Sequence, residues 1–283
     1  MRVISRLTDS GVEVFDADLA LLRTFPADPA TEGFAVPGSR DRLIYATDSA
    51  VRRIAPDGRE EWRLDLGRRG PDAGFAETSV ALSADESQVW VYAPNGMAGR
   101  DRADEWIVLD AATGTPVTRH PLPTKGHGGQ QFALTDGRML LDVGEGQDGS
   151  RCFLAGPDGD VRAVAWGSRV IVGISPDEKH VMTVNHDQSD ATFHDFSDLS
   201  GAGVTVDAPD DHLLEWTGGY LTEDVAIIVL TDDDDSWKHH RVDTRTGEVL
   251  GELGIVTVDE YDLQPLGDGT YLITDTDGTL RRM

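Results

Sequence analysis

The chain has 283 residues, of which 51 are acidic and 25 are basic, so its formal net charge at neutral pH is −26. Such a surface repels nucleic-acid phosphates and anionic lipid headgroups, so we expect neither nucleic acid nor a membrane as partner. It favours a cationic small molecule, a basic protein segment or a metal ion, and a charge spread over the surface for solubility explains it as well. The single cysteine, Cys152, allows no intramolecular disulfide and fits a reducing, cytoplasmic location.

The hydropathy pattern does not point to a membrane protein. The first residues contain no apolar segment typical of a signal peptide, and the longest apolar run, residues 225–230, is too short to span a bilayer. We therefore expect a soluble, cytoplasmic protein, monomeric and folded as a single domain over residues 1–283.

Taken in chain order, the sequence predicts short β-strands separated by Gly, Asp, Asn and Pro. Three strands are expected near the N-terminus, at residues 2–7, 12–16 and 20–25. Phe15, Leu19 and Leu22 also stand at helical spacing there, and a strand pair explains the segment as well as a helix does. The three strands expected near the C-terminus contain YDLQPL, YLITD and TLRRM.

A repeat runs between these ends. A strand leads into a Ser-x-Asp turn and a second strand; an acidic loop, a third strand, an Asp-Gly or Thr-Gly turn and a fourth strand follow. Its parts occur at residues 51–62, 80–92, 106–117, 172–184 and 241–250. The glycines fit because tight hairpin turns need a residue at positive φ.

These segments resemble β-propeller repeats. The Ser-x-Asp-Glu turns at Ser83 and Ser175 resemble the first hairpin of WD40-like blades, and residues 54–62 and 109–117 resemble the blade turn of quinoprotein-like (PQQ-type) repeats. The resemblance implies an all-β propeller of four-stranded antiparallel blades. It extends to architecture only, because the Gly-His and Trp-Asp signatures of WD40 blades are absent. No quinone-binding motif is present, so no quinone cofactor is implied.

The blade number follows from the first strand of each unit. Such strands are expected at Phe34, Val80, Phe132, Ile171, Leu214 and Leu263. With the terminal strands added, we predict seven blades, the ring being closed by strands from both termini. Six blades remain a close alternative, because both spacings are typical of propellers.

In a propeller, the loops from second to third strand and the connections between blades share one face, the usual binding side. The loop carboxylates Asp48, Glu145, Asp232, Asp233, Asp234 and Asp235 are the candidate ligand-binding residues. Trp216 could wall a pocket for an organic cation. The alternative is local, since Asp closes hairpins by bonding its own backbone. Four consecutive aspartates exceed that need.

Three histidines, His127, His186 and His212, fall on loops expected at this face, with Asp187 beside them. They could ligate a divalent metal such as zinc or act as general acid and base. Their spacing matches no metal motif, and ordinary loop histidines explain them as well. His194 alternates with two Phe residues and is expected to face solvent.

Two functions follow, and a third, purely structural role as an assembly scaffold stays open. The first is a binding protein that holds a small molecule or a basic protein segment on its acidic loop face. The second is a propeller hydrolase or lyase that uses the three histidines and Asp187, with or without a divalent metal. The sequence contains no nucleophile or phosphate-binding motif that would decide between them.

Overall fold

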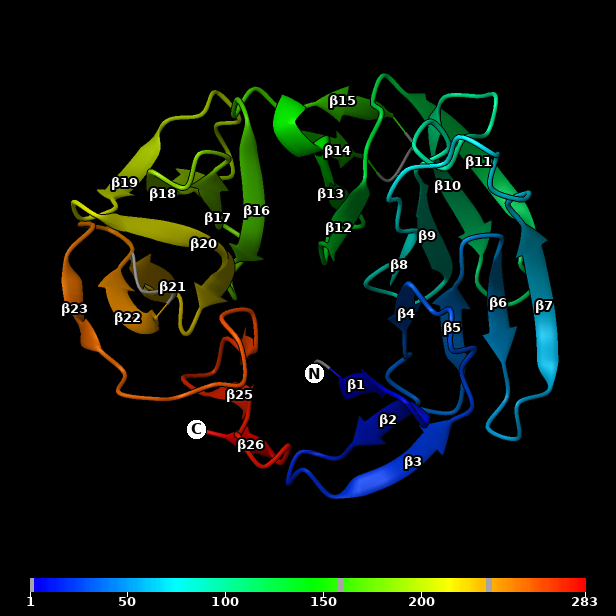
Figure 1. The fold of residues 1–283 in the computed structure, drawn as a ribbon, viewed down its shortest axis with the longest axis horizontal. Helices are drawn as coiled ribbons and strands as arrows, with labels where there is room; N and C mark the ends of the chain where they lie inside the picture. Colours follow the sequence, from blue (N-terminus) through cyan, green and yellow to red (C-terminus); the bar gives the residue numbers. More distant parts are fainter. Residues whose placement is uncertain (1–2, 157–159, 233–235) are drawn as a thin grey trace. The chain divides into compact units, whose positions relative to one another are not determined.

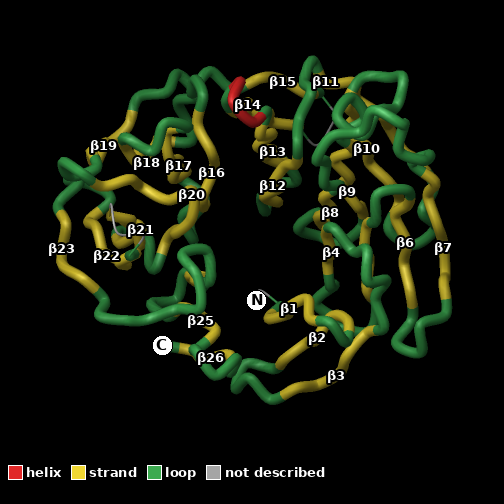
Figure 2. The backbone as a smooth tube through the Cα atoms, in the orientation of Figure 1, coloured by secondary structure: helices red, strands yellow, loops and turns green. Residues whose placement is uncertain are grey.

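The computed structural model describes residues 3–156, 160–232 and 236–283 (Figure 1). The described part is built of strands and loops, with one short 3-10 helix at Gly146–Asp148 (Figure 2). Among these residues, no helix has the length and apolar character needed to cross a membrane. The chain forms two compact units, Met1–Ala163 and Val164–Met283. The single-domain organisation stays a prediction.

The first unit contains four antiparallel sheets, each made of consecutive strands. The first sheet is β1 (Ile4–Thr8), β2 (Gly11–Phe15) and β3 (Leu21–Phe25). The second is β4 (Gly33–Ala35), β5 (Leu43–Ala46), β6 (Ala50–Ile54) and β7 (Glu60–Asp65). The third is β8 (Ser79–Leu82), β9 (Gln88–Ala93), β10 (Asp104–Asp110) and β11 (Pro116–Leu122). The fourth is β12 (Gly128–Ala133), β13 (Met139–Gly144), β14 (Ser150–Ala155) and β15 (Val161–Ala163).

The second unit contains three sheets of the same kind. The first is β16 (Arg169–Ile174), β17 (His180–Asn185), β18 (Asp190–Asp195) and β19 (Gly203–Asp207). The second is β20 (His212–Tyr220), β21 (Val225–Asp232), β22 (Trp237–Asp243) and β23 (Val249–Glu252). The third is β24 (Leu263–Pro265), β25 (Tyr271–Thr274) and β26 (Leu280–Arg282).

Seven consecutive antiparallel sheets are the blades of a seven-blade β-propeller, so the predicted fold class and blade number are confirmed. All six residues expected in first strands lie in β4, β8, β12, β16, β20 and β24. The terminal strands form a three-stranded blade at each end of the chain, β1–β3 and β24–β26. The ambiguous segment around Leu19 is a strand pair, β2 and β3, and not a helix.

The core lies between neighbouring blades, because both faces of each middle strand are covered. In β9 the residues Val89 to Ala93 are all buried, and in β21 so are Ala226 to Leu230. Such strands have continuous apolar runs instead of the alternation of a half-exposed strand. Trp62 of β7 packs with Val89 and Ile107 of the following blade.

The Thr-Gly turn shows why the repeat requires glycine. Gly114 has φ +69, and a Cβ atom there would lie 2.6 Å from the Trp62 ring. The indole N–H of Trp62 donates to the Ala111 carbonyl at 3.0 Å. The glycine therefore permits both the turn and the close packing of one blade on the next.

The expectation that His194 faces solvent is wrong. Its side chain is 1% exposed, stacks on Trp166 at 4.9 Å between ring centroids, and bonds the Thr183 hydroxyl at 2.8 Å through Nε2. His194 lies in β18, which pairs with strands on both sides, and the covered blade face buries it. Alternation along one strand does not reveal whether a neighbouring blade covers its outer face.

Candidate functional site

In each unit, successive antiparallel strands bring second-to-third-strand loops and blade connections to the same end of the sheets. We call that end the loop face of the unit. In the first unit it comprises residues 9–10, 26–32, 47–49, 66–78, 94–103, 123–127 and 145–149. In the second unit its described loops are residues 164–168, 186–189, 208–211, 253–262 and 275–279. Asp233, Asp234 and Asp235 lie outside the described residues.

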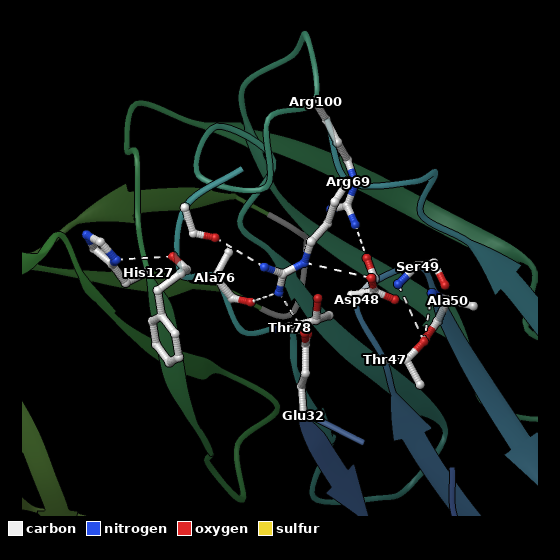
Figure 3. A network of polar contacts seen from close by, with 12 residues as sticks. Glu32, Thr47, Asp48, Ser49, Ala50, Arg69, Ala76, Thr78, Arg100 and His127 are labelled. Carbon is white, nitrogen blue, oxygen red and sulfur yellow. Dashed lines mark hydrogen bonds and ion pairs between the residues drawn. The ribbon is translucent and has the colours of Figure 1, made fainter. Parts of the chain in front are cut away.

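A polar network fixes the β7–β8 connection, residues 66–78, on the loop face of the first unit (Figure 3). Arg69 is its centre. One terminal nitrogen donates to the Gly74 carbonyl at 3.1 Å, and the other donates to the Ala76 carbonyl and to Glu32 at 2.9 Å. Its Nε lies 3.8 Å from an Asp48 carboxylate oxygen. The planar guanidinium therefore joins three loops around the β4–β7 blade: the β3–β4 connection, the β5–β6 loop and the β7–β8 connection.

His127 holds the same connection from the following blade. Its Nδ1–H donates to the Phe75 carbonyl at 3.1 Å, which sets the ring tautomer, and its own carbonyl accepts from the Glu77 N–H at 2.7 Å. A Cβ atom on Gly146 would lie 2.8 Å from His127 Nε2, so the ring packs closely on the β13–β14 loop. In this structure His127 positions a loop segment; its predicted catalytic role stays untested.

These bonds leave two side chains on the solvent side. Ala76 and Thr78 are buried, whereas Phe75 and Glu77 are exposed, so exposure alternates along this segment. Phe75 is 65% exposed, an unusual position for a large aromatic ring. The segment thus presents a ring and a carboxylate side by side from a fixed backbone.

A buried carboxylate anchors the neighbouring loops of this face. Asp104, fully buried at the start of β10, accepts hydrogen bonds from the Tyr92 hydroxyl at 2.9 Å and the Gly96 N–H at 2.8 Å. It also accepts from the Thr124 hydroxyl at 2.9 Å and the Gly126 N–H at 2.8 Å. Burial, and then the charge of Asp104, raise the pKa of Tyr92 well above its ordinary value. Asp104 therefore ties the loop carrying His127 to the β9–β10 loop.

Two predicted ligand-binding carboxylates of the first unit already have partners. Glu145 is paired with Arg151 at 2.7 Å and accepts the Lys125 N–H at 3.0 Å. Asp48 is more exposed and lies near Arg69, while its backbone carbonyl accepts a hydrogen bond from Arg100. Asp48 therefore retains some freedom to meet a ligand, whereas Glu145 serves the loop itself.

In the second unit, the predicted aromatic residue Trp216 stacks on His186 with ring centroids 5.4 Å apart and planes at 16°. The Trp216 indole N–H donates to the Asn185 carbonyl at 3.2 Å. Beside it, Glu215 accepts from Tyr261 at 3.1 Å. Burial, followed by the Glu215 charge, raises the pKa of Tyr261 to about 12. Two predicted site residues, Trp216 and His186, are thus brought together.

The other predicted residues of the second unit are engaged locally. His212 donates from Nδ1 to the Asp210 carbonyl at 3.0 Å and pairs in register with Asp232 across β20 and β21. Asp187 accepts from the Ser189 N–H and hydroxyl at 3.1 and 2.6 Å, which lowers its pKa. These are the turn-closing bonds expected of loop aspartates.

No group of three or more His, Cys, Asp or Glu side chains among the described residues is placed to hold a metal ion. The predicted metal ligands belong to different units, His127 to the first and His186 and His212 to the second. A divalent metal held by these three histidines stays a prediction.

The sequence reasoning missed Phe75, Glu77 and Arg69. A signal was present, because Phe75 is the only aromatic residue in a connection rich in glycine and charge, GRRGPDAGFAET. The sequence does not show the partner of that segment, because His127 lies 52 residues away in the chain.

No protein-family profile matches the chain, and no curated protein matches its sequence. Solved structures match its fold. Hydrazine synthase of Kuenenia stuttgartiensis is 10% identical, with 99% of this chain and 91% of that chain covered and a TM-score of 0.66. BamB of Moraxella catarrhalis is 15% identical, with coverages of 99% and 80% and a TM-score of 0.58. Hsv2 of Kluyveromyces lactis is 13% identical, with coverages of 89% and 73% and a TM-score of 0.57. At these identities the likeness shows the β-propeller fold alone, and that fold assigns no activity.

Proposed function

We propose that this protein is a binding module for a basic protein segment, which it holds on the loop face of its second unit. The supporting observation is the one-sided charge of that face. Its described loops contain eight carboxylates and neither lysine nor arginine. The carboxylates are Asp187, Asp210, Asp211, Asp259, Glu260, Asp262, Asp275 and Asp277. Complementary charge speeds encounter and sets the orientation of a partner.

The local interactions leave much of this charge uncompensated. Arg281 of β26 pairs with Asp275 at 2.5 Å and lies 3.9 Å from Asp277. Asp187, Asp259 and Asp262 accept hydrogen bonds from neutral groups, which orient a carboxylate without cancelling its charge. A partner with several cationic side chains would contact these carboxylates on several loops. A small cation would contact only a few of them, which favours a basic protein segment over a small molecule.

Apolar side chains on the same face suggest that the partner is amphipathic. Val256 is 70% exposed, and Val258 and Tyr261 of the same connection are also exposed. Leu213, at the start of β20, adds a fourth exposed apolar side chain at this end of the unit. Exposed apolar side chains within a charged rim are typical of interaction sites.

Fluorescence anisotropy with labelled peptides tests the proposal. The probe is an amphipathic peptide in which lysine and arginine alternate with leucine, and the matched control replaces every cation with glutamate. We expect saturable binding of the basic peptide only, weakening as salt rises, since exposed charges are screened within about 10 Å at 0.1 M salt. Replacing Val256 and Val258 with serine should weaken binding without changing the salt dependence.

Equal binding of both peptides would contradict the proposal. So would a basic peptide that binds with no dependence on salt, because the charge of the loop face would then play no part. Binding of spermine as tight as that of the peptide would favour a small polycation instead.

A further inference from the structure

We infer that Phe75 and Glu77, on the loop face of the first unit, form a binding site for a guanidinium group. The inference does not depend on the loop face of the second unit. The expected ligand is an arginine side chain of a partner protein, whose planar cation can stack on the Phe75 ring while its N–H groups bond the Glu77 carboxylate.

The two side chains converge on the same place in the fold. The ring centroid of Phe75 lies 6.4 Å from that of His127, with the planes at 26°. A Cβ atom on the next residue, Gly128, would lie 4.0 Å from a Glu77 carboxylate oxygen. The Phe75 and Glu77 side chains thus lie against adjacent residues of the same loop, His127 and Gly128. Phe75 and Glu77 are only two residues apart and both are exposed, so one planar cation can reach both groups.

Glu77 lacks a counter-charge of its own. Arg69 is paired with Glu32 at 2.9 Å, and Glu32 also accepts the Thr78 N–H at 2.7 Å. No ion pair with Glu77 is found among the described residues. Partial burial of its carboxylate, and then the nearby charge of Glu32, raise the pKa of Glu77, while the charge of Arg69 acts in the opposite direction. A bound cation would relieve both costs.

The backbone that presents this pair is fixed before any ligand arrives. Arg69 holds the carbonyls of Gly74 and Ala76, and the Gly74 N–H donates to the Met97 carbonyl at 2.9 Å. His127 holds Phe75 and Glu77 themselves through the two hydrogen bonds described above. A ligand would therefore order two side chains only, and this preorganisation keeps the entropic cost of binding small.

Chemical-shift mapping on the full chain tests the site. The probe is a Gly/Ser peptide that carries two arginines, and the amide signals of Glu77 and Gly128 report on binding. We expect saturable shifts at both amides. The same peptide with citrulline, which keeps the shape and loses the charge, should produce none. A lysine peptide should bind several-fold more weakly, since an ammonium cannot stack or bond in a bidentate manner.

Variants identify the two contacts. Phe75→Ala and Glu77→Gln should each weaken binding about threefold, the effect of an exposed cation–π contact or an exposed ion pair. Asp57→Asn, which makes the same charge change on an exposed turn at the opposite end of the unit, is the control for Glu77→Gln. Val117→Ala removes another exposed apolar side chain and is the control for Phe75→Ala. Neither control should change the affinity.

Three results would overturn the inference: shifts with the citrulline peptide, equal affinity for lysine and arginine peptides, or equal losses in Asp57→Asn and Glu77→Gln. Methylguanidinium, which has the planar cation and no peptide backbone, distinguishes the source of the ligand. Binding of the peptide alone assigns the site to arginine within a chain, and equal binding of the free compound assigns it to small guanidinium molecules; both support the site. Substituting Asp211 and Glu260 of the second unit should leave the shifts at Glu77 unchanged.

Discussion

Stability at mildly acidic pH is expected to depend strongly on one buried histidine. His239 of β22 is 1% exposed, pairs in register with Val229, and has no hydrogen-bond partner on either ring nitrogen among the described residues. Burial, followed by the charge of neighbouring His240, lowers its pKa from 6.5 to about 4, while Glu252 opposes the shift. At mildly acidic pH, His239 is therefore protonated in the unfolded chain and neutral in the folded protein.

The direction and size of the change in unfolding free energy with pH follow from proton linkage. The folded-state pKa lies below the unfolded value, so the stabilisation is fully present above pH 6.5 and is lost as pH falls toward 4. A shift from 6.5 to about 4 corresponds to about 3 kcal/mol when fully developed. Between pH 7 and pH 5 it removes about 2 kcal/mol from the free energy of unfolding.

Urea unfolding of the wild type and of His239→Leu at pH 7 and pH 5 measures this loss. Leucine keeps the side chain apolar and does not titrate, and all other groups are shared by both proteins. We expect the wild type to lose about 2 kcal/mol more than the variant over this interval. Equal losses in the two proteins would refute the assignment of His239 as a buried neutral imidazole.

Substitutions at three further positions test the network of the first unit. Arg69→Lys loses the planar fork that holds two carbonyl groups and should cost about 2 kcal/mol of unfolding free energy in urea titrations; an unchanged midpoint would show that the carbonyls find other donors. His127→Ala should cost about 1 kcal/mol, whereas His127→Asn keeps a donor toward the Phe75 carbonyl and should recover most of the loss in thermal melting. Asp104→Asn places an amide group among buried donors and should cost about 3 kcal/mol, with equal stability contradicting the four hydrogen bonds seen at this carboxylate.

The fold could be predicted because its signals are local. The Thr-Gly turn at Gly114 and the Ser-x-Asp turns require particular backbone angles, and they recur at the spacing of a blade. Burial of individual side chains could not be predicted in the same way. The alternating pattern of its own strand predicts that His194 is exposed, and only the packing of the blade shows that both faces of this strand are covered.

The sequence predicts where the candidate site residues lie in the fold, but not which role each of them has. Loop carboxylates such as Asp48 and Glu145 fall where the repeat predicts them, since strand order fixes which end each loop leaves. Their partners are non-local. Arg151, which neutralises Glu145, lies on the neighbouring strand, and the bond between His127 and Phe75 crosses 52 residues. Sequence spacing alone cannot show which carboxylate is already paired and which is free.

Binding of a basic segment to the loop face of the second unit can be checked with one paired measurement. The affinity of the basic peptide is compared between Asp211→Asn/Glu260→Gln, on the loop face, and Asp198→Asn/Glu223→Gln, at the opposite end of the same unit. Both double variants change the net charge equally. We expect about tenfold weaker binding in the first double variant and an unchanged affinity in the second. Equal weakening in both would contradict this expectation, because net charge and not the loop face would then govern binding.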